Sequence, residues 1–366
     1  MRIALVHDDL TQRGGAERVV AAMHAIWPEA PIFTSVYDPE ATFPEFKDAD
    51  VRTSFLQKVP LAGQARHNKK FFALYPMAFE TLDLRGYDVV LSSSTRFAHG
   101  VITGPETLHI CYCHAPMRFA WRYHEYVTEG NFGKTERSVL PGIIHQQRVW
   151  DFCAAQRVDT FLTNSKNIAR RIKKHYRRDS EVLYPPAETG RFQVVENPSA
   201  DFLLVVSRLL PYKRVDLAVE ACTRLNKPLK VVGGGPDTDR LKAMAGPSVS
   251  FLGRLSDSEI ESLYANCKAF LFPGEEDFGI APIEAMASGR PVVAFGAGGA
   301  LESVIENETG LFFREPTVDS LCDALERLES LVVDGARLRQ HAEKFDRVQF
   351  QSALKCFVEE AWEQHR

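Results

Sequence analysis

The sequence predicts an α/β protein of two doubly wound domains in tandem, each a parallel sheet covered by helices. The chain has 366 residues, which is too long for one ordinary hydrophobic core. Short β-rich runs alternate with helical patterns throughout, as they do where helical crossovers join parallel strands. A second series of such runs begins after Tyr184-Pro185-Pro186, so we expect domains at residues 1–186 and 187–346.

The first series supplies the expected strands of the first domain. Ile3–His7 opens it and precedes a glycine-containing loop and a helix near Glu17–Trp27. Each run is short and apolar, as buried strands of a parallel sheet are. The further expected strands are Pro31–Val36, Tyr87–Ser92, Leu108–Cys113 and Thr160–Thr163.

The second series repeats this arrangement. A helix over Val215–Leu225 follows its first strand, and Ser256-Asp257-Ser258-Glu259 opens another helix with N-cap chemistry. Ligands of such domains bind at the carboxyl ends of strands, so the default site is the cleft between the two domains. The expected strands are Phe202–Ser207, Leu229–Val232, Val249–Leu252, Ala269–Phe272 and Pro291–Phe295.

The tail of the chain, Phe345 to Arg366, is helical in pattern, and we expect a helix at about residues 347–366. Its apolar residues fall at helical spacing. On the pattern alone, this helix packs on its own domain. The stripe consists of Phe350, Leu354, Phe357, Val358 and Ala361.

Composition excludes several classes of protein. The net charge of −4 gives no reason to expect a nucleic-acid partner, although the first 180 residues are net basic and suit an anionic bilayer surface. The start of the chain turns acidic too soon for a signal peptide, and no run approaches the roughly 20 apolar residues of a membrane span. We therefore expect a cytoplasmic protein, peripheral at the inner face of a membrane.

The seven cysteines are scattered in largely apolar surroundings, which is typical of reduced, buried thiols. Cys111-Tyr112-Cys113-His114 is the densest group of metal-ligand residue types. Its spacing is not that of a zinc site, and no second Cys/His pair accompanies it. We expect no metal there.

Two carboxylates, Glu276 and Glu284, lie eight residues apart after the strand Ala269–Phe272. Pro282 suits the first helical position and Gly289 the helix end, which places Glu284 in the first helical turn and Glu276 in the loop. Carboxylates bind sugar hydroxyls and helix N-termini bind phosphate, and a sugar nucleotide carries both groups. The alternative is that Glu284 merely caps its own helix.

Three cations, Arg208, Lys213 and Arg214, precede the helix Val215–Leu225. Cations at a helix N-terminus oppose the macrodipole, which is unfavourable unless an anion binds between them. Paired Arg and Lys side chains suit a diphosphate. The alternative is ordinary solvated surface charge.

Glycine loops recur at strand ends. Arg13-Gly14-Gly15-Ala16-Glu17-Arg18 occupies the matching place in the first domain, where adjacent glycines let the backbone approach a ligand. Gly233-Gly234-Gly235-Pro236 lacks the lysine of a P-loop, and neither segment is a dinucleotide fingerprint. Gly296-Ala297-Gly298-Gly299, followed by Glu302, repeats the theme, with a simple tight turn as the alternative.

His114 follows the strand Leu108–Cys113. A histidine at the carboxyl end of a strand could hydrogen-bond a sugar hydroxyl or a phosphate oxygen. The alternative is that it satisfies a backbone carbonyl.

Together these segments resemble family 4 glycosyltransferases of the GT-B architecture, and the resemblance covers nearly the whole chain. Its most specific part is the E-x7-E element, Glu276 to Glu284. Val206-Ser-Arg-Leu-Leu-Pro-Tyr-Lys213 matches the Arg/Lys diphosphate motif, with Ser207 where glycine is more usual. Bacterial O-antigen and exopolysaccharide mannosyltransferases are similar at Cys113–Phe119, where Ala115 replaces the common threonine, at Glu275–Gly279 and at Gly298–Glu302.

The resemblance implies roles for individual residues. Arg208 and Lys213 neutralise the donor diphosphate, and Gly15 lies against the phosphates from across the cleft. Glu276 binds donor-sugar hydroxyls, Glu284 binds ribose hydroxyls, and His114 contacts the transferred sugar. The predicted catalytic residues are His114, Arg208, Lys213 and Glu276. The predicted donor-binding residues are Gly14, Gly15, Arg208, Lys213, Arg254, Glu276, Phe278, Gly279, Ile280, Ala281 and Glu284.

The resemblance also implies retention of anomeric configuration and a tail helix that crosses back to the first domain. Because the chain shows no Asp-x-Asp at a suitable loop but does show Arg208 and Lys213, we predict transfer without a metal or other cofactor. The expected reaction moves α-mannose from GDP-mannose onto a lipid-linked or oligosaccharide acceptor in surface polysaccharide biosynthesis. Two basic segments, Arg66–Pro76 and Arg170–Arg178, suit such an acceptor at an anionic bilayer, with solvated helix surface as the alternative.

Three other functions stay open. A UDP-sugar donor differs only in the base, which we expect the region Phe251–Leu255 to read. A GT-B-like sugar-nucleotide epimerase shares the nucleotide site but needs paired acid/base carboxylates. A non-enzymatic sugar-nucleotide binding protein would have no need for His114 and the cations to converge.

Overall fold

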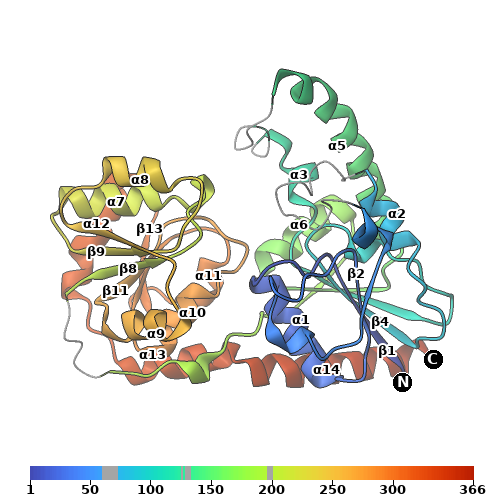
Figure 1. Ribbon diagram of the computed structural model, residues 1–366. Coiled ribbons are helices and arrows are strands. Elements are labelled where there is room, and N and C mark those ends of the chain that lie inside the picture. The colour runs from blue at the N-terminus through green and yellow to red at the C-terminus, as the bar shows by residue number, and fades with distance from the viewer. Residues whose placement is uncertain (60–72, 125–126, 128–132, 196–200) are drawn as a thin grey trace. The chain divides into compact units, whose positions relative to one another are not determined.

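A computed structural model describes residues 1–59, 73–124, 127, 133–195 and 201–366. The chain divides into two compact units, Met1–Pro186 with Phe350–Arg366, and Ala187–Gln349. Each unit contains a parallel sheet flanked by helices (Figure 1), so the predicted α/β fold class is confirmed.

The described part of the first unit forms a seven-stranded sheet of order β3-β2-β1-β4-β5-β6-β7. Neighbouring strands all pair in parallel. The order reverses between β1 and β4, and ligands of such sheets bind at the carboxyl ends of strands beside this reversal. The strands are β1 Ile3–His7, β2 Ile32–Thr34, β3 Val51–Thr53, β4 Val89–Ser94, β5 Leu108–Cys113, β6 Thr160–Thr163 and β7 Glu181–Val182.

Helices cover both faces of this sheet. Helix α1 (Gly15–Ile26) and the tail helix α14 (Arg347–His365) pack on one face. In that core Leu354 and Val358 lie with strand residues such as Leu5, so the alternative that the tail packs on its own domain is wrong. The other face is covered by α2 Tyr75–Glu80, α3 Arg118–Trp121, α5 Lys134–Ala155 and α6 Lys166–Tyr176.

The described residues of the second unit form a six-stranded parallel sheet of order β10-β9-β8-β11-β12-β13. Here the reversal lies between β8 and β11. The strands are β8 Leu203–Val206, β9 Leu229–Val232, β10 Val249–Gly253, β11 Ala269–Phe272, β12 Val292–Phe295 and β13 Gly310–Phe313.

The helices of the second unit also lie on both faces of its sheet. Helices α7 (Val215–Arg224) and α12 (Val318–Arg327) share one hydrophobic core with the strands, and α8 (Thr238–Met244) packs beside α7. The opposite face carries α9 Asp257–Asn266, α10 Ala281–Ala287 and α13 Gly335–Ala342, and the short α11 spans Ala300–Ser303. Helix α9 begins with the predicted cap, since Ser256 and Glu259 form a capping box.

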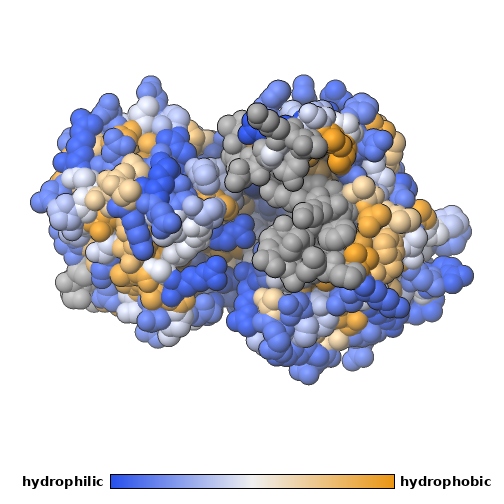
Figure 2. All heavy atoms as spheres, turned by 45° about the horizontal axis from the view of Figure 1, so that its top comes forward, coloured by the Kyte–Doolittle hydropathy of each residue, from blue (hydrophilic) through white to orange (hydrophobic). Residues whose placement is uncertain are grey.

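Hydrophilic residues cover much of the face drawn in Figure 2, in keeping with an ordinary globular surface. Within the described ranges, we find no helix that is both long and apolar enough to cross a bilayer.

Candidate active site

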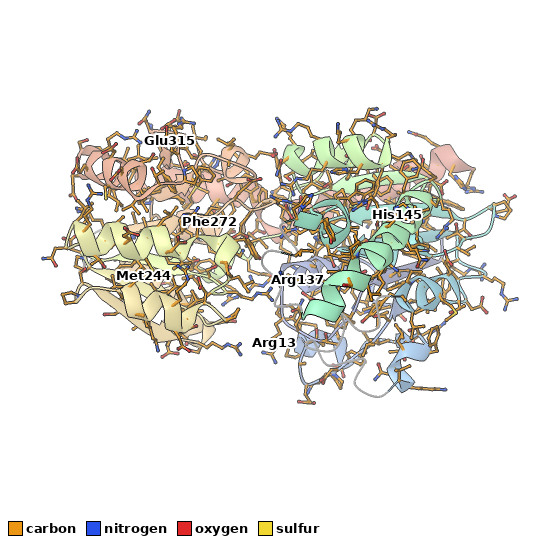
Figure 3. All side chains as sticks on the ribbon, turned by 90° about the horizontal axis from the view of Figure 1, so that it is seen from above. Arg13, Arg137, His145, Met244, Phe272 and Glu315 are labelled. Atoms are coloured by element: carbon orange, nitrogen blue, oxygen red, sulfur yellow. The ribbon has the colours of Figure 1, made fainter. Side chains whose placement is uncertain are left out.

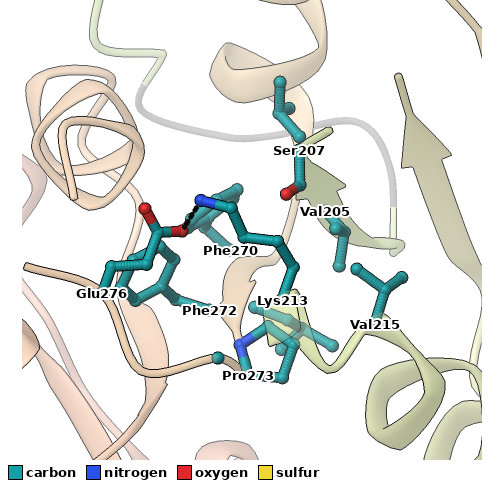
Figure 4. A pocket seen from close by; sticks show the side chains of 11 residues that line it. Val205, Ser207, Lys213, Val215, Phe270, Phe272, Pro273 and Glu276 are labelled. Carbon is teal, nitrogen blue, oxygen red and sulfur yellow. Dashed lines mark ion pairs between the residues drawn. The ribbon is translucent and has the colours of Figure 1, made fainter. Parts of the chain in front are cut away.

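The strand reversal in the second sheet brings two predicted site residues together. Lys213 follows β8 and Glu276 follows β11, and their Nζ and Oε1 atoms lie 2.5 Å apart. Both line a small pocket together with Ser207 and Phe272, and Figure 4 shows the ammonium directed at the carboxylate. The pairing of one predicted diphosphate ligand with one predicted sugar ligand indicates a single binding site.

Local backbone geometry fixes the position of Lys213. It ends a 3-10 turn that begins at Pro211, and Arg214 then adopts a left-handed conformation, with φ of 51°, before α7 begins. The loop after β11 runs directly against it, because a Cβ on Gly274 would lie 2.8 Å from the carbonyl oxygen of Lys213. Gly274 was not predicted as a site residue, although it lies only two residues before the E-x7-E element.

Arg208 follows β8 and Arg254 follows β10, and these two strands lie on either side of β9 in the same sheet. The loop of Arg208 rests on the glycine loop after β9, where a Cβ on Gly235 would lie 2.2 Å from the carbonyl oxygen of Leu209. Arg208 is exposed, and among the described residues its side chain has no ion pair or hydrogen bond. Arg254 Nε lies 3.9 Å from the position of a Cβ on Gly234. Both guanidinium groups are thus available to an anion at this edge of the sheet.

A second glycine loop supports Glu276. The Gly299 N–H donates to the Glu276 carbonyl at 2.8 Å, and a Cβ on Gly298, whose φ is 61°, would lie 2.3 Å from that carbonyl. A Cβ on Gly299 would lie 2.2 Å from Cα of Phe278. The alternative of a simple tight turn is therefore incomplete, because this loop is packed against the predicted sugar-binding segment.

The rest of the E-x7-E element is compact. Phe278 is buried against Phe345, so only its backbone is available to a ligand. Gly279 has a φ of 87° and packs on the ring of Phe272, which Figure 3 labels at the end of β11. Ile280 is the N-cap of α10, Ala281 and Pro282 are its first two residues, and Gly289 adopts a positive φ just past its end.

Glu284 lies in the first turn of α10, as predicted, and is half-buried. Its Oε2 accepts a hydrogen bond of 3.2 Å from the Tyr264 hydroxyl of α9. The carboxylate thus has a partner on a neighbouring helix, beyond the helix-capping role that was its alternative.

In the first unit, His114 lies at the carboxyl end of β5, as predicted. Its Nε2 is 2.8 Å from the hydroxyl of Ser93, at the end of β4, and Asn164 donates to its carbonyl oxygen. The ring thus has a hydroxyl partner on the neighbouring strand.

The Gly14-Gly15 turn opens α1, with Gly14 as its N-cap. A Cβ on Gly14 would lie 2.5 Å from Oε2 of Glu17, so a side chain here would displace this buried carboxylate. Arg13, labelled in Figure 3, donates to the Thr42 carbonyl.

Charged residues that were not predicted surround this turn. Glu17 Oε1 lies 3.9 Å from Nε2 of His7, the last residue of β1, and the two side chains are only 3% and 2% exposed. Burial alone would raise the pKa of Glu17, but His7 outweighs it and lowers that pKa. His7 Nδ1 lies 2.9 Å from the Ser93 carbonyl oxygen, so Ser93 contacts both His7 and His114.

Asp8 holds the loop after β4. Its carboxylate accepts hydrogen bonds from the N–H groups of residues 95–98, including 2.6 Å from Phe97. Burial would raise its pKa, but the charge of Arg96 and these hydrogen bonds lower it to about 2. Arg96 itself pairs with Asp9. In the sequence, the only signal that could have identified these residues as part of the site is their position directly after predicted strands.

The described residues include no group of three His, Cys, Asp or Glu side chains that could hold a metal ion. Cys111 and Cys113 are buried thiols that form no disulfide within the described part of the chain.

Sequence comparisons agree with this geometry. The family Glycosyl transferases group 1 matches residues 187–345, which is nearly the whole second unit. The alpha-1,3/1,6-mannosyltransferase ALG2 of Homo sapiens is 27% identical over 376 residues, covering 89% of this chain and 86% of that protein. This chain is a glycosyltransferase. A GDP-mannose-dependent alpha-(1-6)-phosphatidylinositol monomannoside mannosyltransferase of Mycobacterium tuberculosis is 32% identical over 156 residues, covering 38% and 40%.

Solved structures share the fold of this glycosyltransferase over its whole length. The structure of HepE from Anabaena in complex with UDP has a TM-score of 0.71 at 19% identity, covering 98% of this chain and all of that one. Sucrose-phosphate synthase from Thermosynechococcus elongatus has a TM-score of 0.73 at 16% identity and covers both chains fully. The fold is therefore the predicted GT-B architecture.

Changing Gly299 to Ala tests the support of Glu276 in this glycosyltransferase. The added Cβ overlaps Phe278 and displaces the segment that follows Glu276. Because a displacement of about 1 Å in a site costs on the order of 100-fold in rate, we expect kcat/KM to fall by about that factor.

The matched control is Gly190→Ala in the same unit, where a Cβ meets nothing within 4 Å. Steady-state kinetics and thermal melting should be measured for both variants. A folded Gly299→Ala variant with the same kcat/KM as Gly190→Ala would contradict the supporting role.

Proposed function

We propose that this glycosyltransferase moves α-mannose from GDP-mannose, with retention of configuration, onto a lipid-linked or oligosaccharide acceptor in surface polysaccharide biosynthesis. The observation that carries the proposal is the Lys213–Glu276 pair, because it joins a phosphate-binding cation to a hydroxyl-binding carboxylate in one pocket. The name of the Mycobacterium tuberculosis relative supports the donor, since it is a GDP-mannose-dependent mannosyltransferase. We place the reaction in the cytoplasm.

The proposed mechanism follows from the negative charge that develops on the leaving group. When the bond between the anomeric carbon and the diphosphate breaks, the electron pair of that bond stays on the departing nucleoside diphosphate. Preorganised cations stabilise such charge best. We assign this role to Lys213 and Arg208, and we propose that no metal takes part. Glu276 then exchanges its ammonium partner for hydroxyls of the sugar, and Glu284 binds the ribose.

In the first unit, we propose that His114 contacts the transferred sugar and that the backbone of Gly14 and Gly15 approaches the donor diphosphate. The Ser93 hydroxyl orients the His114 ring. Arg254, at the end of β10, is proposed to lie near the nucleotide. We propose that the same region discriminates between guanine and uracil.

The direct test of the donor is an activity assay with GDP-mannose and UDP-glucose, each with and without acceptor oligosaccharide and EDTA. We expect GDP-mannose to be consumed only when acceptor is present, at a rate that EDTA does not change. Reaction of the donor alone would indicate the epimerase instead. If the enzyme prefers UDP-glucose, the proposed donor GDP-mannose is wrong. EDTA inhibition that Mn²⁺ or Mg²⁺ reverses would overturn the metal-independent mechanism.

Lys213→Ala and Arg208→Ala should each lower kcat by on the order of 100-fold or more, because each removes a charge that stabilises the leaving diphosphate. Lys213→Ala also leaves Glu276 without its ion-pair partner. The control is Arg224→Ala at the far end of α7, where the cation is 61% exposed and pairs with Asp319. If either site variant folds and turns over like the control, the assigned role is wrong.

We also propose that the basic face of α6 holds the enzyme at an anionic bilayer, where a lipid-linked acceptor lies. The apolar side of α6 is buried and consists of Ile168, Ile172 and Tyr176. Attachment to a bilayer through this helix would therefore depend on its charged side chains. Arg170 and Lys174 are exposed. Of the other basic segment, Arg66–Pro76, residues 66–72 lie outside the described residues.

Vesicle sedimentation tests this attachment. Arg170→Glu with Lys174→Glu should abolish binding to anionic vesicles at low salt, because each cation near the surface contributes about 1 kcal/mol. Lys355→Glu, on the exposed side of α14, is the control. Equal binding of the double variant and the control, or no binding of the unaltered enzyme, would contradict the proposal.

A further inference from the structure

A buried pair of opposite charges lies beneath the Gly14-Gly15 turn and has no part in the function proposed above. His7 ends β1 and Glu17 belongs to the first turn of α1, and both are almost completely buried. Their facing atoms, Nε2 and Oε1, are 3.9 Å apart. Gln12 also donates to Oε1 at 3.0 Å.

The contacts of His7 fix its protonation. Nδ1 lies 2.9 Å from the carbonyl oxygen of Ser93, which can only accept, so Nδ1 carries a proton. Nε2 faces the Glu17 carboxylate, and an unprotonated nitrogen would direct its lone pair at that negative charge. These contacts favour the imidazolium form of His7.

Glu17 occupies a position where an anionic ligand would otherwise bind. The N–H groups in the first turn of a helix attract anions, and Gly14 provides no side-chain cap. Glu17 Oε2 is buried, points at Gly14, and has no hydrogen-bond partner among the described residues. An uncompensated carboxylate here would repel a diphosphate that approaches the turn.

We propose that His7 is the counter-charge that makes the Gly14-Gly15 turn accept the donor diphosphate, and that loss of its proton exposes the charge of Glu17 and weakens donor binding. This inference rests on the proposed function, in which the turn approaches the diphosphate. His7 and Glu17 are positioning residues, since they act through the turn.

The surroundings of His7 give the direction of its pH dependence. Glu17 faces it from α1, and Asp8 and Asp9 follow it in the loop after β1. Arg96 lies in the loop after β4, and His114 directly follows β5. Burial alone would lower the pKa of His7, but the carboxylates of Glu17, Asp8 and Asp9 raise it above its ordinary value. The imidazolium is therefore present below this raised pKa and is lost as pH rises through it.

The test is the dissociation constant of GDP-mannose for the full chain, measured by calorimetry between about pH 6 and 9, which spans the titration of such a histidine. We expect affinity to fall by on the order of tenfold across this range, as the turn gains one negative charge. Glu17→Gln keeps the shape and removes the charge, so its affinity should stay high and independent of pH.

His7→Asn keeps a donor toward Ser93 but removes the positive charge. It should bind weakly at every pH, and combining it with Glu17→Gln should restore binding. The control is His145→Asn, an exposed histidine of α5 that Figure 3 labels, which should keep the pH dependence of the unaltered enzyme.

Circular dichroism and thermal melting check the fold of each variant. If His7→Asn does not fold, the pH dependence of GDP-mannose affinity in Glu17→Gln tests the inference by itself. Affinity that does not change with pH in the unaltered enzyme, or a Glu17→Gln variant that keeps the pH dependence, would overturn this inference and leave the proposed function standing. Failure to bind GDP-mannose or UDP-glucose at any pH would overturn both.

Discussion

The ion pair between Lys213 and Glu276 is the interaction on which the account of the second unit depends. The two residues are 63 positions apart in the chain, but they follow β8 and β11, which are neighbours where the strand order reverses. The sheet topology therefore creates the site, and the glycines beside it let three loops approach closely enough for the side chains to meet. Neither charge is isolated, because each is the ion-pair partner of the other.

The first unit uses the same topology with different chemistry. Its strand ends carry His7, Ser93 and His114, which contact one another in series across β1, β4 and β5. The second unit presents the exposed guanidinium groups of Arg208 and Arg254 at its strand ends, whereas His7 and Glu17 of the first unit form a buried pair.

Much of the architecture could be predicted because buried parallel strands form short apolar runs. Ile3–His7, Leu108–Cys113 and Ala269–Phe272 appear with the predicted bounds. The strands that were missed lie at sheet edges: β3 and β7 are short and partly exposed, so they lack that signal. Edge strand β13 was also missed, although it is buried. The contacts of Gly298 and Gly299 with Glu276, and of Glu17 with His7, join distant segments, so no local pattern could predict them.

The central claim is that fixed cations of the second unit receive the charge of the departing diphosphate. A crystal structure of the enzyme with GDP-mannose or GDP tests it most directly, through the distances from the phosphate oxygens to Lys213 Nζ and the Arg208 guanidinium. The account predicts both within hydrogen-bonding distance, with Glu276 turned from Lys213 to the sugar hydroxyls in the GDP-mannose complex. A diphosphate bound away from both side chains would contradict it.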